Sequence, residues 1–156
     1  MKSYFPDVNV WVALAYRGHQ HHPVAASWFE RLKSDTVGFC RLTQLGFLRL
    51  LTHPAVMRHE VKTQVDAWKA YDLLASDSRV AFYPEPNSDD VESKLRTLTA
   101  MEQFAPQQWP DAYLAAFADV AGLTLVTFDR ALSKLASEHV LLLNGYIRQH
   151  RALDRF

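Results

Sequence analysis

The order of apolar and polar positions divides the chain into short β-type runs and longer segments with helical spacing. Because helical segments separate the β-type runs, the pattern predicts an α/β fold, a three-layer α/β/α sandwich with a mainly parallel sheet. Helices would cover both faces of that sheet. The predicted strands are Ser3–Pro6, Thr36–Cys40, Val80–Tyr83, Leu123–Phe128 and Val140–Leu143.

Proline and glycine mark several helix boundaries. His53 precedes a proline and is therefore pushed out of the helical region, which ends one helix there. Gly122 suits the stop of another helix, and we expect that helix to bury Tyr113, Leu114, Phe117, Val120 and Ala121. The predicted helices are Val8–Tyr16, Pro23–Lys33, Thr43–Thr52, Thr63–Ala75, one after the loop at 84–90, one opened by Pro110 and Asp111, and Ala131–Ser137.

Three acidic residues near the loop at 84–90 suit a structural role. Asp89, Asp90 and Glu92 fall in the first turn of the helix that follows this loop. Carboxylates are favourable there because a helix N-terminus carries a partial positive charge. We therefore predict that these three side chains stabilise the helix end and take no part in catalysis.

Composition bounds the class of protein. The 156 residues suit one domain, which we expect at 1–143, followed by a modestly basic tail at 144–156 that is either mobile or partner-facing. Hydrophobic residues make up 49% and charged residues 22%, which excludes wholesale disorder. Seventeen basic residues balance seventeen acidic ones, so any nucleic-acid surface must be local.

Nothing in the chain predicts export or membrane insertion. The apolar stretch Val8–Tyr16 is interrupted by Asn9 and lacks a convincing cleavage site, so it is not a signal peptide. No apolar run approaches the roughly 20 residues that span a bilayer. The single cysteine, Cys40, suits a buried thiol in a reducing compartment. We expect a cytoplasmic protein without membrane contact.

Three aspartates are the strongest candidates for chemistry. Asp7 and Asp129 each follow a predicted strand, at the edge where open α/β sheets bind ligands. Asp111 opens the helix that leads into the Asp129 strand, so this unit can bring it to the same edge. Three close carboxylates repel one another unless a cation lies between them. The sequence therefore predicts convergence of these acids around a metal ion.

Oxygen ligands of this kind favour Mg²⁺ or Mn²⁺. Such an ion would lower the pKa of a bound water, orient a scissile phosphate and neutralise the leaving oxygen, which suits phosphodiester hydrolysis. Asn9 and Thr127 each lie two residues from an aspartate and are candidates to hydrogen-bond a carboxylate or a bound water. The alternatives are an ordinary N-cap for Asn9 and a packing role for Thr127.

Around these residues the sequence resembles the PIN-domain ribonucleases, specifically the VapC-type toxins of bacterial toxin–antitoxin pairs. Four blocks in the same order carry the resemblance: Phe5–Trp11, Leu42–Leu51, Trp109–Ala116 and Leu125–Arg130. The resemblance implies a PIN-like sandwich and a Mg²⁺- or Mn²⁺-dependent endoribonuclease. It also implies a homodimer, and a cognate antitoxin that inserts a segment into the active-site groove to form a hetero-oligomer.

The family resemblance also assigns residues. Asp7, Asp111 and Asp129 match three of its acidic positions, and Asn9 and Thr127 match its polar positions. A further acid is usual on the helix after the second strand, where this chain has Thr43-Gln44. Gln44 is the candidate replacement, because its amide oxygen can accept a hydrogen bond from a bound water without adding charge. Pro54 separates the other candidate, Glu60, from that helix.

Several further residues have two interpretations. Arg49 lies in a family-like block and is a candidate for the groove or the antitoxin contact, and Trp109 could stack an RNA base or pack in the core. The group His19, His21 and His22 fits a solvated turn better than a metal site, because no matching ligand cluster exists elsewhere.

Two other functions compete with the nuclease. A haloacid-dehalogenase-like phosphatase would use Asp7 as a nucleophile, but it requires a second aspartate where Asn9 stands. A catalytically weak module that binds RNA or a partner would follow from the missing fourth acid. That module predicts RNA affinity without turnover.

Overall fold

In the computed structural model, which describes residues 1–136 and 138–143, the described strands form one parallel sheet. This confirms the predicted mainly parallel sheet, and each predicted strand is present. The first has the predicted bounds, and the other four are one or two residues shorter than predicted. The strand order is β3-β2-β1-β4-β5. The strands are β1 Ser3–Pro6, β2 Thr36–Phe39, β3 Val80–Phe82, β4 Thr124–Thr127 and β5 Val140–Leu142.

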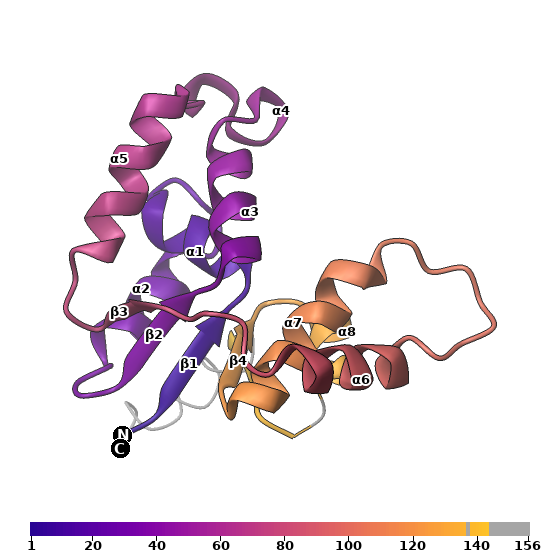
Figure 1. The fold of residues 1–156 in the computed structure, drawn as a ribbon. Helices are drawn as coiled ribbons and strands as arrows, with labels where there is room; N and C mark the ends of the chain where they lie inside the picture. The colour runs from indigo at the N-terminus through magenta and orange to yellow at the C-terminus, as the bar shows by residue number, and fades with distance from the viewer. Residues whose placement is uncertain (137, 144–156) are drawn as a thin grey trace, which may run out of the picture.

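Helices cover both faces of the sheet (Figure 1). One face packs against α1, α2, α3 and α5, and the other packs against α7 and α8, with α6 lying on α7. The helices are α1 Val8–Ala15, α2 His22–Glu30, α3 Arg41–Leu51, α4 Pro54–Met57, η1 Arg58–Glu60, α5 Gln64–Ala75, α6 Ser88–Leu98, α7 Gln108–Ala121 and α8 Arg130–Leu135.

Alternation along the central strands divides the core into two layers. In β1, Tyr4 packs into the layer beneath α1 and α2, whereas the next residue, Phe5, packs into the layer beneath α7. In β4, Leu125 and Val126 divide in the same way. Successive side chains of a strand point to opposite faces, so this pattern is what a sheet buried on both faces requires.

The strand order places a switch point between β1 and β4. The chain passes from β1 outward through β2 to β3 and then returns to the other side of β1 as β4. In open α/β sheets, ligands bind outside the carboxyl ends of the strands at such a point. Asp7 directly follows β1, and Asp129 follows β4 after one intervening residue.

Some helix details differ from the prediction. The helix expected to open at Pro110 begins earlier, at Gln108, so Asp111 lies within its first turn. Its buried side is rich in alanine, with Ala112, Ala115, Ala116 and Ala118 buried, while Ala121 is exposed. Leu114 and Phe117 are buried as predicted, whereas Tyr113 and Val120 are only half-buried. Gly122 ends this helix in the left-handed conformation, as predicted.

Other expectations on helix ends and burial are also tested. Asn87 caps α6 by accepting hydrogen bonds from the backbone N–H groups of Asp89 and Asp90, which lie in the first turn as predicted. Glu92 lies beyond the first turn and pairs with Arg96 instead, so the prediction was wrong for that residue. Cys40 is buried, as expected. The segment after His53 forms two short helices, α4 and η1, that are not among the predicted elements. The predicted tail at 144–156 lies outside the described residues.

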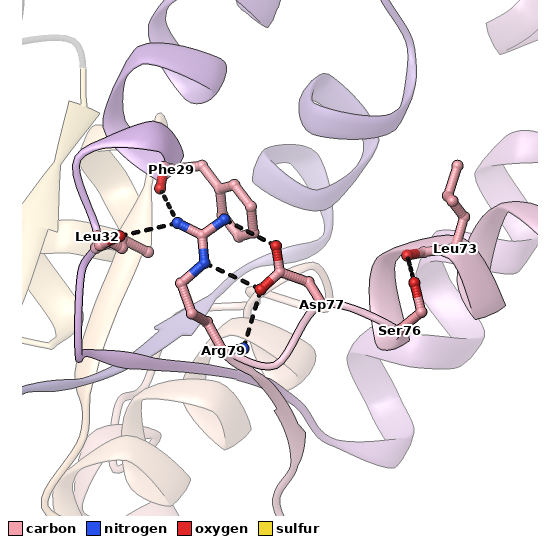
Figure 2. Close-up of polar contacts among 6 residues, drawn as sticks. All are labelled: Phe29, Leu32, Leu73, Ser76, Asp77 and Arg79. Atoms are coloured by element: carbon pink, nitrogen blue, oxygen red, sulfur yellow. Dashed lines mark hydrogen bonds and ion pairs between the residues drawn. The ribbon is translucent and has the colours of Figure 1, made fainter.

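A polar clasp joins the end of α2 to the start of β3 (Figure 2). The guanidinium of Arg79 donates to the backbone oxygens of Phe29 and Leu32 and pairs with both carboxylate oxygens of Asp77. The same group lies 4.2 Å from the centre of the Phe29 ring. One side chain thus fixes the helix that flanks the sheet to the edge strand.

Among the described residues, no helix is both long and apolar enough to cross a membrane.

Candidate active site

The site begins at the helix caps that follow the two central strands. Asp7 caps α1, because its Oδ1 accepts the backbone N–H of Val10 at 3.2 Å. Asp129 caps α8 in the same manner, with its Oδ1 accepting the backbone N–H of Ala131 at 2.8 Å. Since β1 and β4 are hydrogen-bonded neighbours, both caps lie at the same edge of the sheet.

Thr127 links these two aspartates. Its hydroxyl donates to Asp7 Oδ2 at 2.5 Å, and its Oγ1 accepts the backbone N–H of Asp129 at 2.9 Å. Thr127 is fully buried, so this hydroxyl has exchanged water for two partners within the site. The geometry therefore gives Thr127 more than a packing role and fixes one carboxylate oxygen of Asp7 in place.

Asp7 is the most buried of the three acids, with 6% of its surface exposed. Desolvation raises the pKa of its carboxyl from 3.8 to about 6, and the negative charge of Asp111 adds to the rise. The hydrogen bonds from Thr127 and Val10 act in the opposite direction. Burial of the charge thus outweighs the hydrogen bonds that stabilise it.

Asp111 reaches this edge from α7. Burial raises the pKa of its carboxyl, and the charge of Asp129 raises it further. Asp111 thus interacts electrostatically with both other aspartates, although they belong to different segments of the chain. This is the mutual repulsion expected of converging carboxylates.

The three aspartates line one cavity of about 390 Å³, which we call the carboxylate cavity. Asn9 and Arg49, which the sequence singled out, also line it. Asn9 lies in α1 beyond the cap, so the N-cap alternative belongs to Asp7 instead. The rest of the lining is Val8, Leu42, Leu45, Gly46, Leu50, Pro110 and Leu114.

Gln44 is not among the residues that line the carboxylate cavity. It is buried, and its amide oxygen accepts a hydrogen bond from Arg41 at 2.5 Å. The α3 residues that do line the cavity are Leu42, Leu45, Gly46, Arg49 and Leu50, and none of them carries an amide or carboxylate side chain. The structure therefore does not bring the proposed replacement to the other site residues.

The donor set of the cavity fits a hard divalent ion. Three carboxylates and the Asn9 amide supply oxygen, without thiolate or imidazole ligands in the lining. Within the described residues, no group of three His, Cys, Asp or Glu side chains forms a ready-made metal cage. Mg²⁺ typically keeps several waters and takes only one or two carboxylates directly, so water would complete the shell here.

The remaining candidates lie outside this cavity. His19, His21 and His22 form a turn in which the backbone N–H of His21 donates to His19 Nδ1 and the ring of His22 hydrogen-bonds the Ala13 carbonyl. The predicted turn is present before α2, but His22 already opens that helix and all three residues are half-buried rather than solvated. Trp109 is 59% exposed, at the start of α7 next to Pro110 and Asp111, so it does not pack in the core.

Fold and site together define an α/β/α protein with carboxylates at the switch point of a parallel sheet. The PIN domain family model matches residues 4–138. The chain therefore belongs to the PIN domain family, and its curated relatives place it within the VapC-type group. Membership in this family argues against the phosphatase alternative.

Two relatives from Mycobacterium tuberculosis illustrate the similarity. Ribonuclease VapC41 is 37% identical over 142 residues, which cover 88% of this chain and 96% of the relative. Ribonuclease VapC38 is 32% identical over 134 residues, which cover 85% of this chain and 89% of the relative.

Solved structures share the fold at low identity. VapBC2 from Rickettsia felis, bound to a DNA fragment from its promoter, matches with a TM-score of 0.66 at 14% identity, covering 89% of this chain and 97% of that chain. VapC20 from M. tuberculosis, described as a sarcin-ricin loop cleaving toxin, matches with a TM-score of 0.62 at 19% identity, covering 84% and 93%. These matches confirm the predicted fold class.

Proposed function

We propose that this protein is a metal-dependent endoribonuclease that acts as the toxin of a type II toxin–antitoxin pair. The observation that carries the proposal is the carboxylate cavity, where acids from three separate segments converge at the switch point of the sheet. The relatives named as ribonucleases support the choice of RNA. The domain at 1–143 would carry this activity, in the cytoplasm where RNA is available.

Asp7, Asp111 and Asp129 would hold Mg²⁺ or Mn²⁺. When bound, the ion supplies Lewis acidity that lowers the pKa of a water and offsets charge on the scissile phosphate. Thr127 would fix one carboxylate oxygen of Asp7 through its hydrogen bond, and Asn9 offers an amide to the same cavity. Arg49, exposed at the cavity, would bind an RNA phosphate and orient the strand.

A cognate antitoxin and a second copy of the chain are the protein partners in this proposal. Exposed apolar side chains along α3 and α5 support a protein contact: Leu45, Val65 and Leu73 are 54%, 64% and 76% exposed. The solved VapBC and FitAB assemblies of the same fold are consistent with an antitoxin partner.

RNA cleavage by the purified, antitoxin-free protein tests the proposal. Structured and unstructured RNAs are incubated with Mg²⁺, Mn²⁺ or EDTA, and cleavage is followed on denaturing gels. We expect cleavage only with added metal. Asp111→Asn and Asp129→Asn should each lower the rate by roughly two orders of magnitude or more, since even indirect partners of a metal ligand contribute 10- to 100-fold.

Asp119→Asn is the matched control. Asp119 lies on the same helix as Asp111, but it pairs with Lys94 at the surface and does not line the carboxylate cavity. This variant should cleave like the wild type. If wild type and Asp129→Asn bind RNA equally and neither cleaves it with any metal, the proposal fails and the protein is a binding module.

A further inference from the structure

A second cavity, of about 430 Å³, lies in the connection between α6 and α7, and we call it the α6–α7 cavity. Figure 1 shows this connection projecting away from the sheet as a long loop beyond the two helices. Residues between Thr99 and Trp109 line the cavity, and none of the lining residues carries a charge. A phosphate or an acidic peptide would therefore find no counter-charge within it.

The apolar lining is unusually exposed. Phe104 is 100% exposed, Trp109 is 59% exposed and Met101 is 37% exposed. Two aromatic side chains and a methionine gathered around one cavity form a surface that water solvates poorly, and such patches mark binding sites more often than isolated exposed residues do. The occupant must offer apolar area to aromatic side chains.

The same cavity contains neutral hydrogen-bonding groups. Gln103, Gln108 and Thr99 line it together with the aromatic residues. The Oε1 atom of Gln108 is buried and has no hydrogen-bond partner among the residues that the structure describes. An unpaired buried acceptor destabilises the protein until a donor reaches it. An occupant with an N–H group beside an apolar surface would satisfy this oxygen.

The α6–α7 cavity and the carboxylate cavity are both lined by residues of the first turn of α7, but they share no lining residue. Gln108 and Trp109 line the former, and the next two residues, Pro110 and Asp111, line the latter. A helix rises about 1.5 Å per residue, so these pairs lie within one turn of each other. An RNA strand whose phosphate is bound through a cation at Asp111 lies at the same end of α7 as Trp109, although side chains two positions apart on a helix do not face each other.

We propose that the α6–α7 cavity binds one unpaired nucleobase of the bound RNA, with Phe104 and Trp109 stacking on it and Gln108 Oε1 accepting its N–H. A base combines a flat apolar face with edge donors, which matches the mixed lining. An aliphatic side chain of a protein partner would leave Gln108 Oε1 unpaired. The inference rests on the proposed nuclease function, because it takes RNA as the ligand.

Affinity for RNA with a missing base tests this inference without requiring cleavage. A single abasic site is moved along a short unstructured RNA, and binding is measured by fluorescence anisotropy to the Asp129→Asn protein. We expect affinity to fall roughly tenfold at one position, since stacking of one base on aromatic residues contributes at this scale. Combining Phe104→Ala with Trp109→Ala should weaken binding of intact RNA similarly and remove the sensitivity to that abasic position.

Two further variants separate stacking from structural damage. Phe104→Ala alone replaces a fully exposed side chain away from Asp111, so it should fold normally and show part of the loss. Trp68→Ala replaces another exposed tryptophan, on α5 and outside both cavities, and should retain the abasic response. Melting curves of all variants confirm folding.

The outcomes distinguish the two levels of the proposal. If the wild type cleaves RNA but affinity does not depend on the position of the abasic site, the nucleobase inference is wrong and the nuclease proposal stands. The expected base-dependent affinity without any cleavage supports the inference and overturns the nuclease. If the double variant binds RNA normally but escapes inhibition by the antitoxin, the cavity is a protein-docking site and the nucleobase inference is wrong.

Discussion

At the scale of a single residue, opposing interactions determine the pKa of the Asp7 carboxyl. As the cap of α1 it accepts a backbone N–H, which favours the charged form. Its burial and the nearby charge of Asp111 disfavour that form and raise the pKa from 3.8 to about 6. In the absence of a cation, the folded protein therefore holds a proton on Asp7 more tightly than the unfolded chain does.

This shift predicts a stability that falls with pH. Between pH 3.8 and about 6 the folded state binds more protons than the unfolded state, so stability is lost as pH rises through the folded pKa. The difference corresponds to on the order of 3 kcal/mol. Asp7→Asn should therefore be more stable than wild type at pH 8 and similar near pH 4, as measured by urea unfolding in EDTA.

Asp119→Asn serves as the control for that measurement, since Asp119 lies at the surface beside Lys94. It should preserve the pH dependence of the wild type. If the difference in unfolding free energy between wild type and Asp7→Asn is the same at pH 4 and pH 8, the predicted pKa shift is wrong.

Individual site residues differ in how well the sequence predicted their positions. The two-residue spacing between Thr127 and Asp129 indicated a shared face, and Thr127 indeed joins Asp129 to Asp7. Gln44 was chosen from its place in a family-like block, without regard to helical phase. Residues three and seven positions further on are Phe47 and Leu51, both fully buried, so Gln44 belongs to the core-facing side of α3.

At the scale of elements, the clasp between α2 and β3 depends on one arginine. Arg79 satisfies two carbonyl oxygens at the end of α2 while it pairs with Asp77 (Figure 2). The last carbonyls of a helix otherwise lack partners, and a cation favours that end. Residues far apart in sequence meet here, and no local pattern in the sequence predicted this contact.

We expect Arg79→Ala to destabilise the protein by about 2–3 kcal/mol, because it leaves Asp77 and the α2 carbonyls without their charged partner. The control is Arg96→Ala, which removes an exposed pair with Glu92 and should cost about 0.5 kcal/mol or less. Chemical denaturation measures both. Equal losses for the two variants would show that the clasp contributes no more than a surface ion pair.

At the scale of the whole molecule, the alternation of strands and helices was enough to predict the class of fold. A parallel sheet buried on both faces needs apolar strands, and the predicted strands were found with small changes in their bounds. The strand order β3-β2-β1-β4-β5 was not predicted, because pairing partners depend on contacts between distant segments. That order creates the switch point between β1 and β4, where Asp7 and Asp129 lie.

The chain has a formal net charge of zero, but three aspartates and one arginine line the carboxylate cavity, so negative charge is in local excess there. Binding of a cation at this edge should therefore stabilise the protein. A proton on Asp7 competes with a cation, since ligation requires the deprotonated carboxylate. Added Mg²⁺ should therefore raise the melting temperature more at pH 8 than at pH 5. Asp7→Asn should lose most of this pH-dependent gain in differential scanning fluorimetry, while Asp119→Asn should retain it. Equal gains at both pH values in the wild type would mean that Asp7 does not bind the ion.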